Sequence, residues 1–179
     1  EAGLRTNERY NPFPEEMNRL LTTQLAALHL APTDTSRTNL EKNGVSKADI
    51  VVTGNTVIDA LIEVVSKDLP IENPLLERTL TTWEGHDVLL VTSHRRESWG
   101  EPMRRAAAAL ARIAKAHPKL LVVLPAHLNP IVREVLLPPL AGSANVVITD
   151  PLSYSDFSQV LNRSTVVLTD SGGVQEEAP

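Results

Sequence analysis

Cysteine is absent from this chain of 179 residues. Its absence excludes disulfide bonds, thiolate zinc sites and a cysteine nucleophile, and it fits a reducing compartment such as the cytoplasm. Long apolar runs are missing as well, because no stretch approaches the roughly 20 residues that a membrane-spanning helix needs. We therefore expect a cytoplasmic protein that has no membrane partner.

A dominant charge of one sign is also lacking. The chain carries 17 Lys and Arg residues against 22 Asp and Glu residues, which gives a net charge of −5 at pH 7. Both signs are interspersed, so no nucleic-acid surface is expected and a phosphate-bearing ligand would need a local site. The five histidines have no Asp or Cys at ligand spacing, and we predict no metal site.

The second half of the chain alternates strands and helices. Four short apolar runs read as strands, at 88–92, 120–124, 146–149 and 166–169. Helical patterns separate them, and the helix expected at 102–117 begins with Pro102, which suits a first helical turn. Strands that are apolar on both faces and alternate with helices indicate a doubly wound parallel sheet with helices on both sides.

The first third of the chain holds less sheet. Its expected strands, at 29–31 and 50–53, are too short to build a core alone. The range 66–84 then breaks the rhythm with Pro70 and Pro74, and we predict a linker there. Residues 1–65 are thus expected to be the C-terminal part of one α/β domain, and residues 85–179 belong to another, of which the resemblance described below makes them the N-terminal part.

Chemically capable residues follow three of the strands in the second half. In an open parallel sheet, ligands bind at the carboxyl ends of the strands. The first of these loops carries His94, an acid or base near neutral pH, and Arg95, which can neutralise a phosphate. The second loop carries His127. By themselves, these residues are also compatible with a solvated loop and a structural histidine.

The last strand runs into Asp170-Ser171-Gly172-Gly173 and the start of a helix. The two glycines permit a close backbone approach and a positive φ, and Ser171 can cap the helix or donate to a phosphate. A carboxylate at Glu177 could accept a hydrogen bond from a sugar hydroxyl. An ordinary strand-to-helix turn remains an equally valid interpretation of this stretch taken alone.

Two glutamates, Glu15 and Glu16, stand at the start of an expected helix, where the helix dipole alone favours acidic residues. Glu1 is uninformative in isolation. Taken together, however, the strand-end loops predict a nucleotide-diphosphate site with an acid/base group beside it, at the interface with a second α/β domain.

Six motifs carry a resemblance to a known family, and they span the whole chain: EAGLRT, PFPEEMNR, VVTGNTVIDAL, SHRRESWG, PAHLNP and TDSGGVQEEAP. In this order and spacing, they resemble the non-hydrolysing UDP-N-acetylglucosamine 2-epimerases of bacteria. The resemblance implies two Rossmann-like, doubly wound domains in the arrangement of the B-type glycosyltransferases, both incomplete in this chain. It also implies a homodimer, no cofactor, and a role in cell-surface polysaccharide biosynthesis.

The family interconverts UDP-N-acetylglucosamine and UDP-N-acetylmannosamine through elimination of UDP to 2-acetamidoglucal and its re-addition. By resemblance, Glu1 and Glu15 move the proton at C2, and His94 assists the leaving diphosphate. The UDP-binding residues implied are Ser171, Gly172, Gly173 and Glu177. An allosteric second UDP-N-acetylglucosamine would contact Arg95 and His127.

The resemblance also predicts that the chain is a central fragment. The family has a complete first sheet before EAGLR, with a catalytic Asp, and further sequence after EEAP. We therefore expect the fragment alone to be inactive. The alternatives are a glycosyltransferase that uses a nucleotide sugar, a hydrolysing epimerase, and a UDP-binding module without catalysis.

Overall fold

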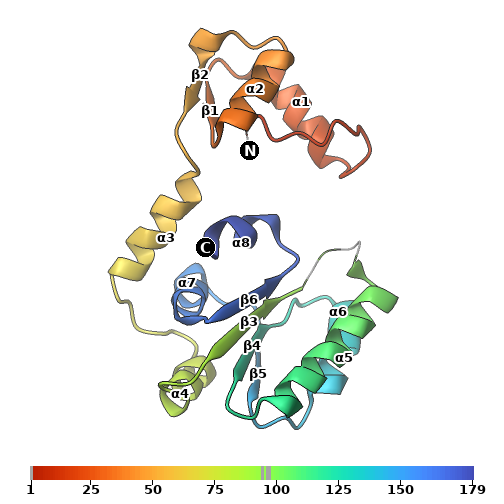
Figure 1. The fold of residues 1–179 in the computed structure, drawn as a ribbon, viewed down its shortest axis with the longest axis vertical. Coiled ribbons are helices and arrows are strands. Elements are labelled where there is room, and N and C mark those ends of the chain that lie inside the picture. Colours follow the sequence, from red (N-terminus) through yellow and green to blue (C-terminus); the bar gives the residue numbers. More distant parts are fainter. Residues whose placement is uncertain (1, 94, 96–97) are drawn as a thin grey trace. The chain divides into compact units, whose positions relative to one another are not determined.

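A computed structural model describes residues 2–93, 95 and 98–179 (Figure 1). The chain forms two compact units, Glu1–Ala60 and Leu61–Pro179. The division falls inside helix α3 (Thr56–Ser66). Each unit is described by itself below.

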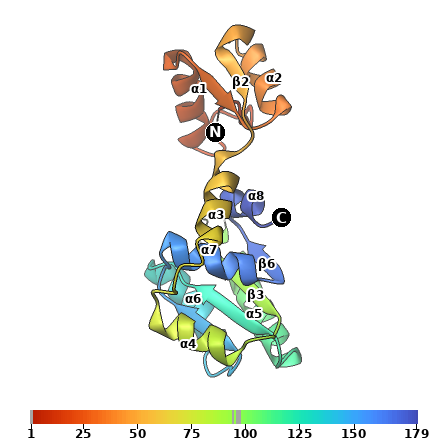
Figure 2. The same cartoon turned by 90° about the vertical axis from the view of Figure 1, so that its left-hand side faces the viewer.

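The first unit is small. It contains helix α1 (Glu15–Leu25), strand β1 (His29–Ala31), helix α2 (Asp34–Lys42), the short 3-10 helix η1 (Lys47–Asp49) and strand β2 (Ile50–Val52). The two strands pair in parallel, with His29 opposite Ile50, and Figure 2 shows them running between α1 and α2. The apolar core is a cluster of Ala31, Leu40 and Ile50.

The second unit is built on a four-stranded parallel sheet. Its strands are β3 (Val88–Thr92), β4 (Leu121–Pro125), β5 (Val146–Thr149) and β6 (Val166–Thr169), in the spatial order β5-β4-β3-β6. Within this sheet, the chain forms β3 first, adds β4 and β5 on one side of it, and then places β6 on the other side of β3. Such a reversal of direction creates a switch point between β3 and β6, where α/β proteins bind ligands at the carboxyl ends of the strands.

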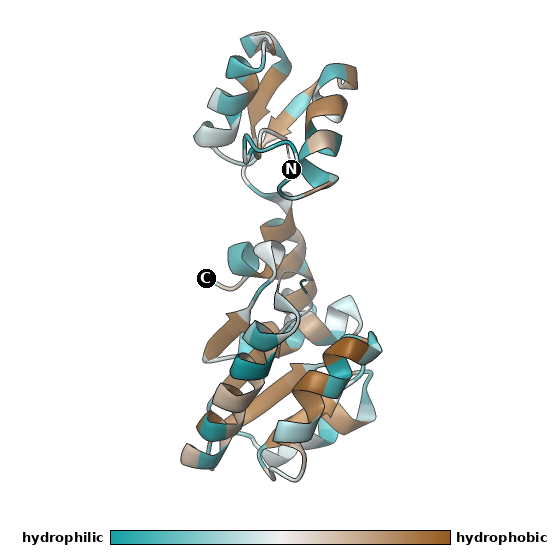
Figure 3. Ribbon diagram, turned by 90° about the vertical axis from the view of Figure 1, so that its right-hand side faces the viewer, coloured by the Kyte–Doolittle hydropathy of each residue, from teal (hydrophilic) through white to brown (hydrophobic). Residues whose placement is uncertain are grey.

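Helices cover both faces of this sheet (Figure 1). One face packs under α5 (Glu101–Ala116) and α6 (Pro130–Leu140), through a cluster that includes Leu89, Leu110 and Leu140. The other face packs under α4 (Pro74–Thr82) and α7 (Tyr154–Arg163). Figure 3 shows the strands coloured as hydrophobic between helices of mixed hydropathy. The predicted α/β class and the parallel sheets are confirmed.

The range 66–84, expected to be a linker, contains helix α4. Its Leu76 and Leu80 are buried in the core of the second unit. Asn73 caps the helix through its side chain, and Pro74 occupies the first turn, where a missing N–H breaks no hydrogen bond. Pro74 therefore starts a helix here, whereas the sequence interpretation took it as a breaker. The assignment of the two units as parts of two larger domains stays a prediction.

Candidate functional site

The loops that follow β3 and β6 meet at the switch point. The hydroxyl oxygens of Thr92 and Thr169 lie 2.6 Å apart, which joins the last residues of the two strands. One residue further on, Asp170 Oδ2 accepts hydrogen bonds from the backbone N–H of Arg95 at 3.0 Å and from the Ser93 hydroxyl at 3.3 Å. Asp170 therefore ties the loop after β3 to the start of the last helix.

That last helix, α8 (Gly172–Glu177), begins with the predicted serine and glycines. The Ser171 hydroxyl caps the helix by accepting the N–H of Val174, and the Ser171 N–H donates to Thr169 Oγ1 at 2.9 Å. Neither Gly172 nor Gly173 has a positive φ. A Cβ atom at Gly172 would lie 3.4 Å from Arg95 Nη2, which is an ordinary contact distance. The measurement places the Arg95 guanidinium beside the start of the helix, but it does not by itself require glycine at this position.

Glu177 closes α8 and is half-buried. Burial raises the pKa of its carboxyl group, and the neighbouring charge of Glu176 raises it further. Loss of water disfavours the ionised form, and a like charge acts in the same direction. A hydroxyl donor supplied by a ligand would offset both effects, because it would stabilise the carboxylate.

His127 lies exposed in the loop after β4. Its Nδ1 accepts the backbone N–H of Asn129 at 3.1 Å, and Asn129 in turn caps α6 through Ile131. A backbone donor on Nδ1 leaves Nε2 as the protonated nitrogen in the neutral ring. Arg133 steadies the same loop, since it donates to the His127 carbonyl at 3.3 Å and pairs with Asp150.

Glu15 belongs to the first unit, where it opens α1 and is exposed. It lines a hollow of ≈ 560 Å³ together with residues of α1, β1 and the segment after Glu1, among them Ala2, Asn18 and Arg19. The structure therefore brings Glu15 and the residue that follows Glu1 to one concave surface. Glu1 and His94 themselves lie outside the described residues, so their predicted roles receive no structural account.

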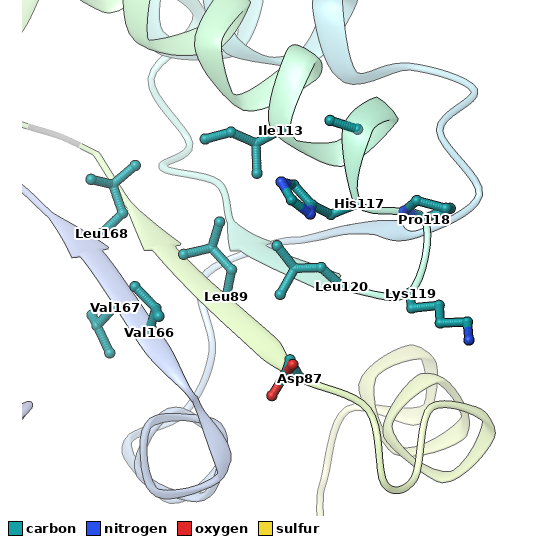
Figure 4. A pocket seen from close by; sticks show the side chains of 11 residues that line it. Asp87, Leu89, Ile113, His117, Pro118, Lys119, Leu120, Val166, Val167 and Leu168 are labelled. Atoms are coloured by element: carbon teal, nitrogen blue, oxygen red, sulfur yellow. The ribbon is translucent and has the colours of Figure 1, made fainter.

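Another hollow, of ≈ 720 Å³, lies on the sheet of the second unit (Figure 4). Apolar side chains such as Leu89, Ile113 and Leu168 line it, and its charged residues, Asp87 and Lys119, stand at the amino ends of strands. Ligands of parallel sheets bind at the opposite end. This hollow is therefore not the predicted nucleotide site.

Two residues to which the sequence analysis gave no functional role have notable positions in the structure. Asp170 was seen as part of the glycine motif but given no role, although an acidic residue at a strand's carboxyl end is a usable signal. Glu16 was interpreted as a simple helix-start residue, yet its side chain is 1% exposed. Residue type and local pattern do not show that Glu16, rather than Glu15, is the buried glutamate.

Within the described part of the chain, no group of three His, Asp or Glu side chains is placed to hold a metal ion. In residues 2–93, 95 and 98–179, likewise, no helix combines the length and the apolar character needed to cross a bilayer.

Comparison with known proteins identifies the family. The family model described as UDP-N-acetylglucosamine 2-epimerase matches residues 1–179. The UDP-N-acetylglucosamine 2-epimerase of Yersinia pestis is 47% identical over 184 residues, which cover 100% of this chain and 48% of that protein. This chain thus spans about half the length of the curated relatives it matches.

Two solved structures agree with this match. The UDP-N-acetylglucosamine 2-epimerase of Neisseria meningitidis bound to UDP-N-acetylglucosamine has a TM-score of 0.87 at 39% identity, with 100% of this chain and 49% of that one covered. MnaA of S. aureus with UDP has a TM-score of 0.90 at 40% identity, with 100% and 47% covered. The chain belongs to the UDP-N-acetylglucosamine 2-epimerase family.

Proposed function

We propose that the protein containing this chain interconverts UDP-N-acetylglucosamine and UDP-N-acetylmannosamine. A base removes the proton from C2 while the C1–O bond to UDP breaks, which forms the C1–C2 double bond of 2-acetamidoglucal. A proton then returns to the opposite face of C2, and a diphosphate oxygen of UDP bonds again to C1. Both sugars are in the same oxidation state, so the reaction needs no electron acceptor.

The observation that carries this proposal is the junction at the switch point. Asp170 ties the loop that bears His94 and Arg95 to the start of α8, and Arg95 Nη2 lies beside Gly172. A cation thus stands next to the first backbone N–H groups of α8, where a diphosphate would leave. Positioned donors at a developing anion are an effective way to lower such a barrier. The Neisseria meningitidis relative, whose structure holds UDP-N-acetylglucosamine, supports the choice of ligand.

The residue roles in this proposal follow the family resemblance. Glu15 and Glu1 move the proton at C2, and His94 stabilises or protonates the leaving diphosphate. Ser171, with the glycines Gly172 and Gly173, holds a phosphate, and Glu177 accepts from the ribose hydroxyls.

The proposal also covers activation by a second ligand, the oligomeric state and the cellular role. Arg95 and His127 contact a second, activating UDP-N-acetylglucosamine. The protein works as a cytoplasmic homodimer in the biosynthesis of cell-surface polysaccharide.

The test is to incubate the protein that contains this chain with UDP-N-acetylglucosamine in D₂O and to follow the anomeric and C2 protons by NMR. We expect UDP-N-acetylmannosamine to form with deuterium at C2. An unchanged C2 proton and no new isomer would refute the epimerase and direct attention to sugar transfer onto an acceptor. Free N-acetylmannosamine with UDP would indicate a hydrolysing enzyme instead.

A further inference from the structure

Helix α1 begins with two adjacent glutamates in opposite environments. Glu15 is exposed and lines the hollow of the first unit, whereas the side chain of Glu16 is 1% exposed. A carboxylate this deeply buried is costly unless hydrogen bonds satisfy its oxygens. The partners of Glu16 therefore show what its burial achieves.

Glu16 receives donors from a separate segment and from its own helix. Its Oε2 accepts the N–H of Thr6 at 3.2 Å and Arg19 Nη1 at 3.1 Å, and its Oε1 accepts the N–H of Asn7 at 3.2 Å. Burial raises the pKa of this carboxyl group, but the hydrogen bonds from Thr6, Arg19 and Asn7 lower it by more. Glu16 is consequently an anion that holds the backbone of residues 6 and 7 against α1.

Two further contacts fasten the same segment upstream. Gly3, with φ +79°, lies so close to α2 that a Cβ atom would stand 2.1 Å from the Ser36 carbonyl oxygen. Arg5 joins α1 to the residue that caps the end of α2, because its Nη2 donates to Thr23 Oγ1 at 2.7 Å and its Nε donates to Asn43 Oδ1 at 2.8 Å. The segment of residues 2–7 is thus held at three successive points.

We propose that Glu16 is a positioning residue. It fixes the segment that follows Glu1 against α1, and so determines where that segment lies in the hollow that Glu15 lines. This inference rests on the proposed function and deepens it. The two neighbouring glutamates then have different roles, since Glu15 faces the substrate and Glu16 holds the backbone of residues 6 and 7. Ala2, the residue after Glu1, lines the same hollow as Glu15, so movement of the segment changes that surface.

The residue type fits the task. Three donors converge on Glu16, and a carboxylate accepts on both oxygens and donates on neither. A glutamine of the same shape would turn an NH₂ group toward at least one of these donors. The substitution Glu16→Gln therefore releases one side of the clamp with almost no change of volume.

The experiment compares Glu16→Gln with wild type in the protein that contains this chain, by deuterium incorporation at C2. We expect kcat per UDP-binding site to fall by roughly 10- to 100-fold, because a small misplacement of reacting groups is that costly, while KM changes by less than about threefold. The matched control is Glu41→Gln, which removes a carboxylate on α2 that pairs with Arg37 and Lys47. It should leave kcat unchanged.

A second variant covers the case in which Glu16→Gln folds poorly, and hydrogen exchange adds a measurement that does not depend on turnover. Asn43→Ala removes one acceptor of Arg5 at an exposed position and should lower kcat in the same direction, by roughly two- to fivefold. Amide hydrogen exchange at Thr6 and Asn7 should accelerate in Glu16→Gln but not in Glu41→Gln, independently of turnover.

The outcomes separate the two claims. A wild-type protein that incorporates no deuterium at C2 refutes the proposed function and, with it, the positioning role that rests on it. If the wild type is active and Glu16→Gln keeps the same kcat per UDP-binding site, the positioning role alone is overturned. A variant that only has fewer UDP-binding sites gives the same conclusion, and Glu16 is then a purely structural group.

Discussion

Each unit of this chain holds a loop with a buried carboxylate that accepts backbone N–H groups, but the apolar cores beside the two carboxylates differ in size. In the first unit, the buried carboxylate of Glu16 holds residues 6 and 7. Among the described residues of this unit, the buried apolar cluster contains Ala31, Leu40 and Ile50, with Ala2 and Val45 packed against it. In the second unit, Asp156 is equally buried and accepts the N–H groups of Glu72 and Asn73 at 2.8 and 3.0 Å. That carboxylate, however, works beside two extensive apolar clusters.

The difference shows where conformational order comes from. A large core holds its secondary structure through burial, and a polar clamp there adds only the placement of a loop. Within residues 2–60 the apolar cluster is small, so in this stretch the Glu16 hydrogen bonds and the tight backbone packing at Gly3 bear more of the conformation. Substitutions in the second unit should therefore act mainly through apolar volume, and those in the first unit through backbone geometry and hydrogen bonds.

The largest effect is expected from the core of the second unit. Leu90 lies in β3 and is 0% exposed, so Leu90→Ala should lower the free energy of unfolding by about 2–5 kcal/mol through lost burial and a residual cavity. Urea denaturation measures this change. Leu30→Ala, at a strand position that is 51% exposed in the first unit, is the control and should change it by less than about 0.5 kcal/mol. Equal losses at the two sites would contradict the assignment of this effect to burial.

Backbone geometry in the first unit ranks next. Gly3→Ala combines a positive φ with a clash against the Ser36 carbonyl and should destabilise the first unit by about 2–4 kcal/mol. Gly44→Ala has a similar φ of +87° but meets nothing within 4 Å, so it should cost only about 1–2 kcal/mol. Hydrogen exchange in α2 would report both changes. Indistinguishable variants would show that the close approach at Gly3 is unimportant.

A smaller effect is expected at the switch point. Asp170→Ala removes the acceptor for Arg95 N–H and the Ser93 hydroxyl, and we expect UDP to bind about tenfold more weakly, equivalent to about 1.4 kcal/mol. Calorimetric titration of UDP measures it. Asp87→Ala removes the acceptor of a hydrogen bond from the Thr165 hydroxyl, at the amino ends of the strands, and should leave UDP affinity unchanged. An unaltered affinity in Asp170→Ala would remove this residue from the site.

The smallest effect concerns pH, and it has opposite signs in the two units. The pKa of Glu16 is lowered, so its contribution to stability is present at neutral pH and is lost as pH falls through the folded-state value. The pKa of Glu177 is raised, so its contribution is present in acid and is lost as pH rises through the folded-state value.

Urea midpoints at about pH 4 and about pH 7 test both signs. Glu16→Gln should narrow the difference between the two midpoints, because the acid-sensitive contribution is gone. Glu177→Gln should raise the neutral midpoint slightly relative to wild type. A wider difference in Glu16→Gln would contradict the lowered pKa.

Much of the fold was predictable from apolar runs and helix signals. The strands at 88–92 and 146–149 were predicted with the observed bounds, and the helix expected at 102–117 is α5, Glu101–Ala116. Helix α4 was missed because Pro70 and Pro74 suggested a break, although Asn73 before Pro74 is a recognisable helix start. Its burial depends on a partner sheet that local sequence does not encode.

The site was less predictable. Ser171 and the glycines stood out because their residue types serve a helix start, and Arg95 because it follows a strand. Asp170 gained its role only when β3 and β6 became neighbours, with residues 75 apart in the chain joined by one hydrogen bond.

By itself, the sequence determined the alternation of strands and helices, the positions of the strand-end loops and the family resemblance, because these depend on residue types at short range. Only the tertiary structure decided which strand-end loops meet, and which of two adjacent glutamates is buried. Glu15 and Glu16 are chemically identical and one helical position apart, about 100° around the axis. The packing of residues 2–7 against α1 therefore separates them, since a hydrogen bond to a remote backbone forms only after the chain has folded.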